Sequence, residues 1–131
     1  MGALSDAGAN ATLDAMLGTS HATTWPATVY VGLSTTDPGV SVTEPTGGAY
    51  ARVAVTNNST NFPAAVSRQK SNAATITFPT ATGAWGTLTH LVLFTAATGG
   101  TLLASDALSA SQSVLAGDVV VVPVAGLVVS M

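Results

Sequence analysis

The sequence has no cysteine and very little charge. Charged residues occupy 7% of the 131 positions, where about a quarter is usual for soluble domains, and the formal net charge is -3. The absence of cysteine excludes disulfides and thiolate metal sites. The basic residues are Arg52, Arg68 and Lys70 alone, too few to form the clusters that neutralise phosphates. We therefore expect no nucleic-acid partner.

Long apolar runs are missing as well. The longest, "VVVVPVAGLVV" from Val119, is interrupted by Pro123 and falls short of the roughly 20 residues that a membrane-spanning helix needs. The N-terminal "MGALSDAGANATL" lacks the basic start and apolar core of a signal peptide. These features predict no membrane partner and no export by the general pathway.

Groups that could perform chemistry are sparse. The histidines are His21 and His90, and the six acidic residues lie at a helix start, on a helix or beside turns. Asp37 and Glu44 share one long loop, but residues of this kind are common in proline-rich loops. No glycine-rich segment has the lysine and following helix of a phosphate-binding loop. We expect no enzyme activity, no cofactor and no metal.

Hydrophobic residues nevertheless make up 47% of the chain, which excludes a disordered protein. Thr, Ser, Asn and Gly supply the polar surface in place of charge. Such a surface repels other copies weakly, so it favours a protein that works in an assembly. A merely neutral surface on a monomer is the alternative.

The first twenty residues predict an N-terminal arm that contains a short helix. Ser5 before Asp6 is typical of a helix start, and Gly18 of a helix end. Leu13, Met16 and Leu17 fall at helical spacing on one face. We expect this narrow apolar stripe to pack on a sheet or on a neighbouring subunit.

From residue 28 onward the apolar pattern has a period of two, which indicates strands. The polar segment 57–72 is expected to be a loop or a short edge segment. The pattern fits a β-sandwich or a small barrel, and we predict an all-β fold: one antiparallel β-sandwich domain over residues 1–131 with one short helix. Jelly-roll and immunoglobulin-like connectivity both remain open. Strands are expected within residues 28–35, 49–56, 73–81, 87–95, 101–117 and 118–131.

Two of these strands carry specific expectations. Residues 88–95 are apolar on both faces in their second half, which predicts a central strand with one face in the core. The N-terminal helix or another copy is expected to cover the other face. The last segment is predicted to be one long strand, so that Val121→Asp or Val124→Asp should disrupt folding or oligomerisation.

Aromatic residues and His90 complete the candidates. Trp25 precedes Pro26 in a loop and Trp85 lies at a strand entry; each fits a plug at the end of a sandwich better than a sugar platform. His90 fits a hydrogen-bonded core or interface residue better than a metal ligand. The candidate interface residues are Leu13, Met16, Leu17, Trp25, Trp85 and His90.

Several segments together resemble a family of small bacteriophage virion proteins. They are "LSDAGANATLDAMLG", "YVGLSTTDPG", "GGAYARVAV", "ATITFPTATGAWGTLTHLVLFTAATGGTLLAS" and "AGDVVVVPVAGLVV", and they span nearly the whole chain. Members of the family are labelled tail fiber or minor tail proteins, and some are similar to capsid decoration proteins. The resemblance implies an all-β structural module that is bound in many copies and has no catalytic residues.

The resemblance leads to a functional prediction with two alternatives. We expect a capsid decoration (cement) protein, forming a homotrimer and binding the major capsid protein and copies of itself. The first alternative is a tail fiber or minor tail component that binds tail proteins. The second is a receptor- or glycan-binding module that uses Trp25, Tyr30, Tyr50 or Trp85. The expected location is the virion, assembled in the bacterial cytoplasm.

Overall fold

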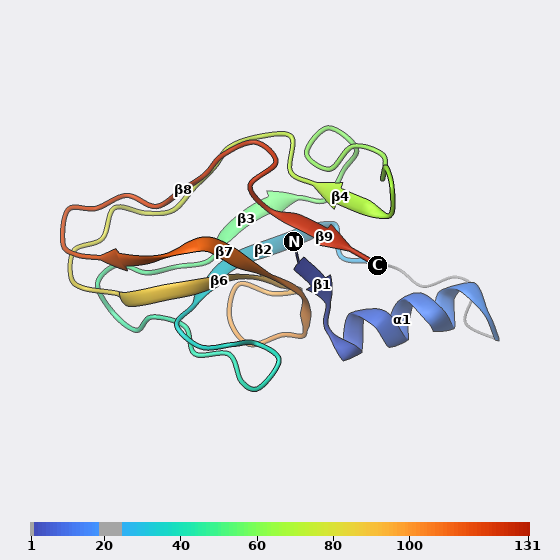
Figure 1. The fold of residues 1–131 in the computed structure, drawn as a ribbon, viewed down its shortest axis with the longest axis horizontal. Coiled ribbons are helices and arrows are strands. Elements are labelled where there is room, and N and C mark those ends of the chain that lie inside the picture. The colour runs from blue at the N-terminus through green and yellow to red at the C-terminus, as the bar shows by residue number, and fades with distance from the viewer. Residues whose placement is uncertain (1, 19–24) are drawn as a thin grey trace.

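The computed structural model describes residues 2–18 and 25–131 (Figure 1). The prediction of an all-β fold with one short helix is confirmed. The elements of the described residues are β1 (Gly2–Leu4), α1 (Asp6–Met16), β2 (Thr28–Ser34), β3 (Val53–Thr56), β4 (Gln69–Ser71), β5 (Ile76–Thr77), β6 (Gly86–Phe94), β7 (Leu102–Val114), β8 (Val121–Val122) and β9 (Val128–Ser130).

The strands form two layers of unequal size. Seven strands make one curled sheet in the order β3-β2-β6-β7-β1-β9-β4, and β5 and β8 form a separate two-stranded ribbon. The ribbon lies over β6 and β7 in Figure 1. All pairings are antiparallel except that of β1 with β9. The sequence pattern did not predict β1, which is short and ties the N-terminus into the middle of the sheet.

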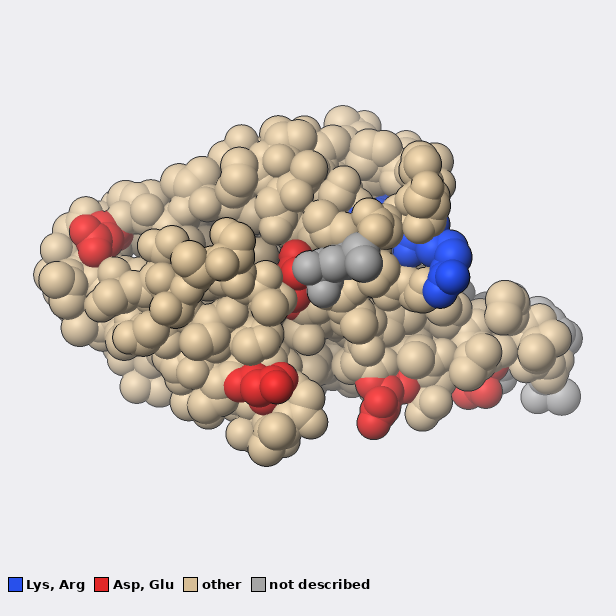
Figure 2. All heavy atoms as spheres, in the orientation of Figure 1, with Lys and Arg blue, Asp and Glu red and all other residues tan. Residues whose placement is uncertain are grey.

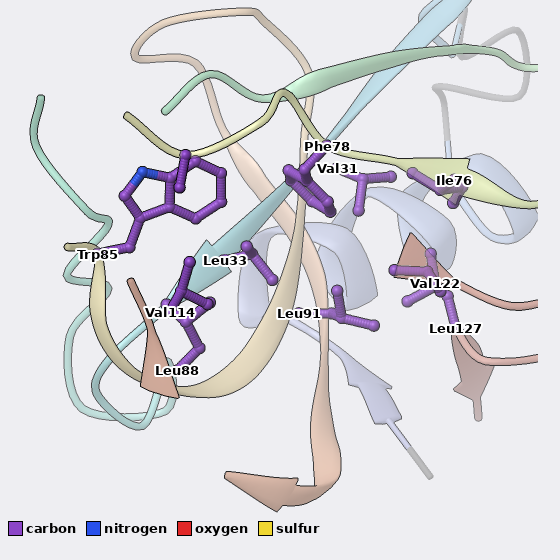
Figure 3. Packing of buried hydrophobic residues seen from close by; sticks show 11 residues of the cluster. Val31, Leu33, Ile76, Phe78, Trp85, Leu88, Leu91, Val114, Val122 and Leu127 are labelled. Atoms are coloured by element: carbon purple, nitrogen blue, oxygen red, sulfur yellow. The ribbon is translucent and has the colours of Figure 1, made fainter. Parts of the chain in front are cut away.

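The core fills the space between these layers. Figure 3 shows Val31 of the large sheet beside Phe78 and Ile76, with Leu33 and Leu91 of the same sheet and Val122 of the ribbon close by. Ile76 and Phe78 are buried while Thr75 and Thr77 are exposed, so the alternation predicted for this segment is confirmed. The buried cluster comprises Val31, Leu33, Ile76, Phe78, Ala81, Trp85, Leu88, Leu91, Val114, Val122 and Leu127.

Strand β6 is central and covered on both faces, as predicted. It pairs with β2 on one side and with β7 on the other. Leu88 and Leu91 belong to the core cluster, while Val92 and Phe94 are buried on the outer face. The chain's own segment 44–52 covers that outer face: the Arg52 guanidinium lies 3.6 Å from the centre of the Phe94 ring. The outer face of β6 is therefore covered by a loop of the same chain, and not by the N-terminal helix or another copy as expected.

The C-terminal segment corrects a second expectation. It forms two strands in different sheets, because the chain turns between them: the Gly126 N–H donates to the Pro123 carbonyl at 2.9 Å. Proline has no N–H to give to a ladder, which favours a break at this position. Val122 is 4% exposed, whereas Val121 and Val124 are 49% and 58% exposed. The two valines expected on alternative core faces are thus both on the surface.

Three other boundaries differ from the sequence pattern. The segment 101–117 forms one strand of 13 residues, β7, instead of one or two shorter ones. Its pairing with β6 shifts register between Leu88 and His90, which lets a long strand follow the curl of the sheet. The strands expected in 49–56 and 73–81 are shortened to β3 and β5.

Helix α1 begins and ends where the sequence predicts. The Ser5 side chain caps it by accepting a hydrogen bond from the Gly8 N–H at 3.1 Å. At the other end the Leu17 N–H donates to the Leu13 carbonyl, and Gly18 follows with a φ of 106°. A membrane-crossing helix, which would have to be longer and more apolar, is not found among the described residues.

Candidate interaction surface

The described residues do not assemble a metal site, and the two acids of the long loop have partners of their own. No group of three or more His, Asp or Glu side chains in residues 2–18 and 25–131 is placed to hold a metal ion. The Asp37 carboxylate accepts the Gly39 N–H within a turn, at 2.9 Å. Glu44 is paired with Arg52. Both acids of the long loop thus have structural partners, and His21 lies outside the described residues.

Glu44, Tyr50 and Arg52 form a hydrogen-bonded cluster at the edge of β2. Arg52 binds both carboxylate oxygens of Glu44, at 2.9 and 2.7 Å, and its Nη1 donates to the carbonyls of Ala96 and Gly99. The Tyr50 hydroxyl donates to Glu44 at 2.6 Å and accepts the Leu33 N–H at 2.9 Å. The cluster therefore fastens two loops to the sheet, which is a structural task.

The ionisation of this cluster follows from its contacts. Burial raises the pKa of Glu44, but the hydrogen bonds from Arg52 and Tyr50 and the charge of Arg52 outweigh it, so this pKa lies below its ordinary value. Burial and the hydrogen bond to Glu44 raise the pKa of Tyr50 well above its ordinary value. At neutral pH the carboxylate is charged and the phenol keeps its proton, as the hydrogen-bond geometry requires.

Helix α1 is held at its N-terminal end and projects from the sheet at the other (Figure 1). The Ser5 N–H donates to the Leu103 carbonyl at 2.7 Å, and the Ser5 hydroxyl donates to the Leu102 carbonyl. Gly8 is buried against Leu103, where a side-chain Cβ would collide with the carbonyl oxygen. The apolar stripe instead faces outward: Leu13, Met16 and Leu17 are 49%, 61% and 70% exposed.

An apolar groove of about 440 Å³ opens beside the helix. Val29, Ala104 and Leu127 form part of its lining, and all three are otherwise buried, so the groove is an opening at the end of the hydrophobic core. Most of its other lining residues come from the helix and from the segment 57–70, and the rest come from β1, the loop before β2, β6, β7 and the C-terminal segment. Among these residues are Leu4, Gly8, Thr12, Trp25, Phe62, Ala65, Arg68 and Lys70.

Positive charge gathers at the groove. Arg68 and Lys70 line it, while Arg52, the third basic residue, is paired with Glu44. Figure 2 shows the blue Lys and Arg atoms at the end of the molecule from which the helix projects. The helix itself carries Asp6 and Asp14, both exposed, and no basic residue. One end of the molecule thus combines an apolar groove, a basic edge and an acidic, partly apolar helix.

The structure gathers four of the six candidate interface residues at this end. Leu13, Met16 and Leu17 lie on the projecting helix, and Trp25, 40% exposed, lines the groove. Trp85 is 3% exposed and lies in the core, where its Nε1 donates to the Gly48 carbonyl at 2.8 Å. This is the plug that the sequence favoured over a sugar platform.

His90 lies away from the groove, in the middle of the sheet. It is half-buried in β6, and its Nδ1 is 2.8 Å from the Thr89 hydroxyl. Sequence reasoning missed the groove, whose apolar lining residues Phe62, Leu103 and Leu127 come from three distant segments. No spacing rule links those segments, so periodicity gave no signal for it.

A comparison with family models identifies a match over almost the entire chain. The model described as "Podophage GP4 fiber I protein gp80" matches residues 3–130. The chain belongs to this family of phage fiber proteins. It is a phage virion structural protein, as the resemblance in its sequence implied, and the fiber description favours the tail fiber alternative over capsid decoration. A search of curated proteins finds no match.

Proposed function

We propose that the chain is a structural component of a podophage tail fiber and works through contacts with copies of itself and with other tail proteins. The observation that carries the proposal is the family match over residues 3–130. The exposed helix stripe and the open apolar groove supply surfaces for such contacts. Assembly takes place in the cytoplasm of the bacterial host, before the virion is released.

The chain's chemistry is consistent with a building block. A 7% charge content leaves few like-charge repulsions between closely packed copies. The acidic and basic residues of the Glu44 cluster are engaged in holding loops, and nothing in the family description names a reaction. We therefore include in the proposal that the protein is not an enzyme and that its function is mechanical.

Location and copy number on the virion test the proposal. Antibodies against the purified chain, labelled with gold, should decorate the tail region of intact virions in electron micrographs. Quantitative mass spectrometry of the same virions should give far fewer copies of this chain than of the major capsid protein. Gold spread over the head, with hundreds of copies per virion, would replace the fiber proposal with the capsid decoration function.

A further inference from the structure

We propose that the groove beside α1 binds the C-terminal half of helix α1 from a second copy of this chain. The inference deepens the proposed function, on which it rests, by naming the partner of this surface. Its failure can be told apart from failure of the fiber proposal, because it is tested on the purified chain and the fiber proposal is tested on virions.

The helix carries an apolar face that its own chain leaves uncovered. Leu13, Met16 and Leu17 are separated by three and four residues, the spacing with which an amphipathic helix enters a groove. Each is about half exposed or more. A helix of 11 residues with such a face is marginal on its own in water, so burial against a partner would stabilise it.

The groove of its own chain does not cover this face. Gly8 and Thr12 already line the groove from the helix side, and the caps at Ser5 fix the helix at β7. At 100° per residue, Leu13 lies about 100° from Thr12 around the helix, whereas Met16 lies within about 40° of Thr12 but one turn further along, where it is still 61% exposed. The chain's own groove thus leaves Leu13, Met16 and Leu17 largely exposed, so a groove on another molecule is available to cover them.

Charge selects a second copy as the occupant. Asp14 follows Leu13 on the exposed part of the helix, and the helix has no basic residue. Arg68 and Lys70 line the groove, with the Arg68 Nε also donating to the Met131 carbonyl at 2.7 Å. An incoming α1 thus brings an apolar stripe to an apolar opening and an acid to a basic edge. The two complementary surfaces are encoded in one chain.

This contact allows closed assemblies. If two copies exchange helices reciprocally, a two-fold dimer results; if each helix enters the next groove in one direction, a ring such as the expected trimer closes. The proposal specifies which surfaces meet, and the measured mass of the assembly shows how many copies it contains.

The first test changes the stripe without changing the helix. The triple variant Leu13→Gln, Met16→Gln, Leu17→Gln keeps residues with similar helix propensity and removes the apolar surface. Sedimentation velocity over a concentration series should show that the parent self-associates. The dissociation constant of the variant should be at least about tenfold higher. The matched control is Leu115→Gln, an exposed leucine in the turn after β7, which should associate like the parent.

The second test identifies the two surfaces that meet. The chain has no cysteine, so a Met16→Cys variant and an Ala65→Cys variant each carry one thiol. Mixed under mild oxidation, they should form a mixed disulfide much faster than Leu115→Cys mixed with Ala65→Cys. Asp14→Lys and Lys70→Asp should each weaken association, and the chain carrying both should recover it.

A parent chain that is monomeric at its highest soluble concentration would overturn the proposal. So would a triple variant that associates like the parent, or equal cross-linking in the two cysteine mixtures. Recovery in the double charge variant supports direct pairing, because a substitution that only damaged the fold would not be repaired by a second one.

Discussion

Glu44 is the residue through which the loop over the outer face of β6 is fixed. Its carboxylate accepts hydrogen bonds from Tyr50 and from two nitrogens of Arg52, and Arg52 in turn stacks on Phe94. The Arg52 side chain is 7% exposed, so removal of the carboxylate would leave a buried cation without its counter-ion. An acid that the sequence suggested was an ordinary residue of a proline-rich loop is thus part of the framework.

Glu44→Gln is expected to lower the free energy of unfolding at pH 7 by about 1–3 kcal/mol, because a charged acceptor is lost. The folded-state pKa of Glu44 lies below its unfolded value, so its stabilisation is present above the unfolded pKa and is lost as pH falls through the folded one. The difference between variant and parent should therefore shrink from pH 7 to pH 3. Urea unfolding at both pH values measures it.

Asp37→Asn is the matched control for this experiment. Its amide oxygen can still accept the Gly39 N–H in the exposed turn, so the change in unfolding free energy should stay within about 0.5 kcal/mol of zero. A Glu44→Gln effect that stayed constant down to pH 3 would show that charge plays no part in the cluster.

At the scale of elements, the docking of α1 depends on the small size of Gly8. Alanine in place of glycine inside a helix normally stabilises it by about 1 kcal/mol. Here the added Cβ would meet the Leu103 carbonyl, a backbone atom that cannot move aside alone. We expect Gly8→Ala to lower the free energy of unfolding despite its better propensity, and amide hydrogen exchange in β1 to become faster.

Asn10→Ala on the exposed side of the same helix provides the comparison. Alanine has a higher helix propensity than asparagine, and at this exposed position it meets no backbone atom. The free energy of unfolding should therefore stay the same or rise slightly. If Gly8→Ala proves as stable as Asn10→Ala in chemical denaturation, α1 does not pack against β7 as closely as described.

The two C-terminal strands give a second element-scale prediction. Val122 on β8 is buried in the core, and Val121 beside it faces solvent. Val122→Ala should cost about 2 kcal/mol of unfolding free energy through lost burial and a small cavity. Val121→Ala should cost under about 0.5 kcal/mol. Equal losses of unfolding free energy for the two variants in chemical denaturation would show that this segment is a strand covered on both faces.

Particular residues show what the sequence could and could not predict. The alternation of Ile76 and Phe78 and the apolar second half of β6 predicted buried strands, since period and burial are directly linked. The break after Val122 was missed because four consecutive valines carry no alternation. The stripe on α1 was predicted, but its partner groove is built from distant segments, and only the tertiary fold brings those together.

At the scale of the whole molecule, low charge and exposed apolar groups couple stability to assembly. An open end of the core exposes apolar lining that a monomer must leave in contact with water. Covering that opening with a neighbour's helix would remove the cost without adding residues to the chain. If a neighbour's helix covers the opening as proposed, the stability of the protein depends on its own concentration.

Thermal unfolding should therefore depend on protein concentration. Binding of a second copy to the folded state adds up to about 1.4 kcal/mol for each tenfold rise in concentration above Kd, which raises the Tm by a few degrees. The variant with glutamine at positions 13, 16 and 17 should unfold at one temperature over the same range, and at the temperature the parent approaches on dilution. Differential scanning calorimetry at several concentrations provides the comparison. A parent Tm that does not change with concentration would mean that the groove stays open to water in solution.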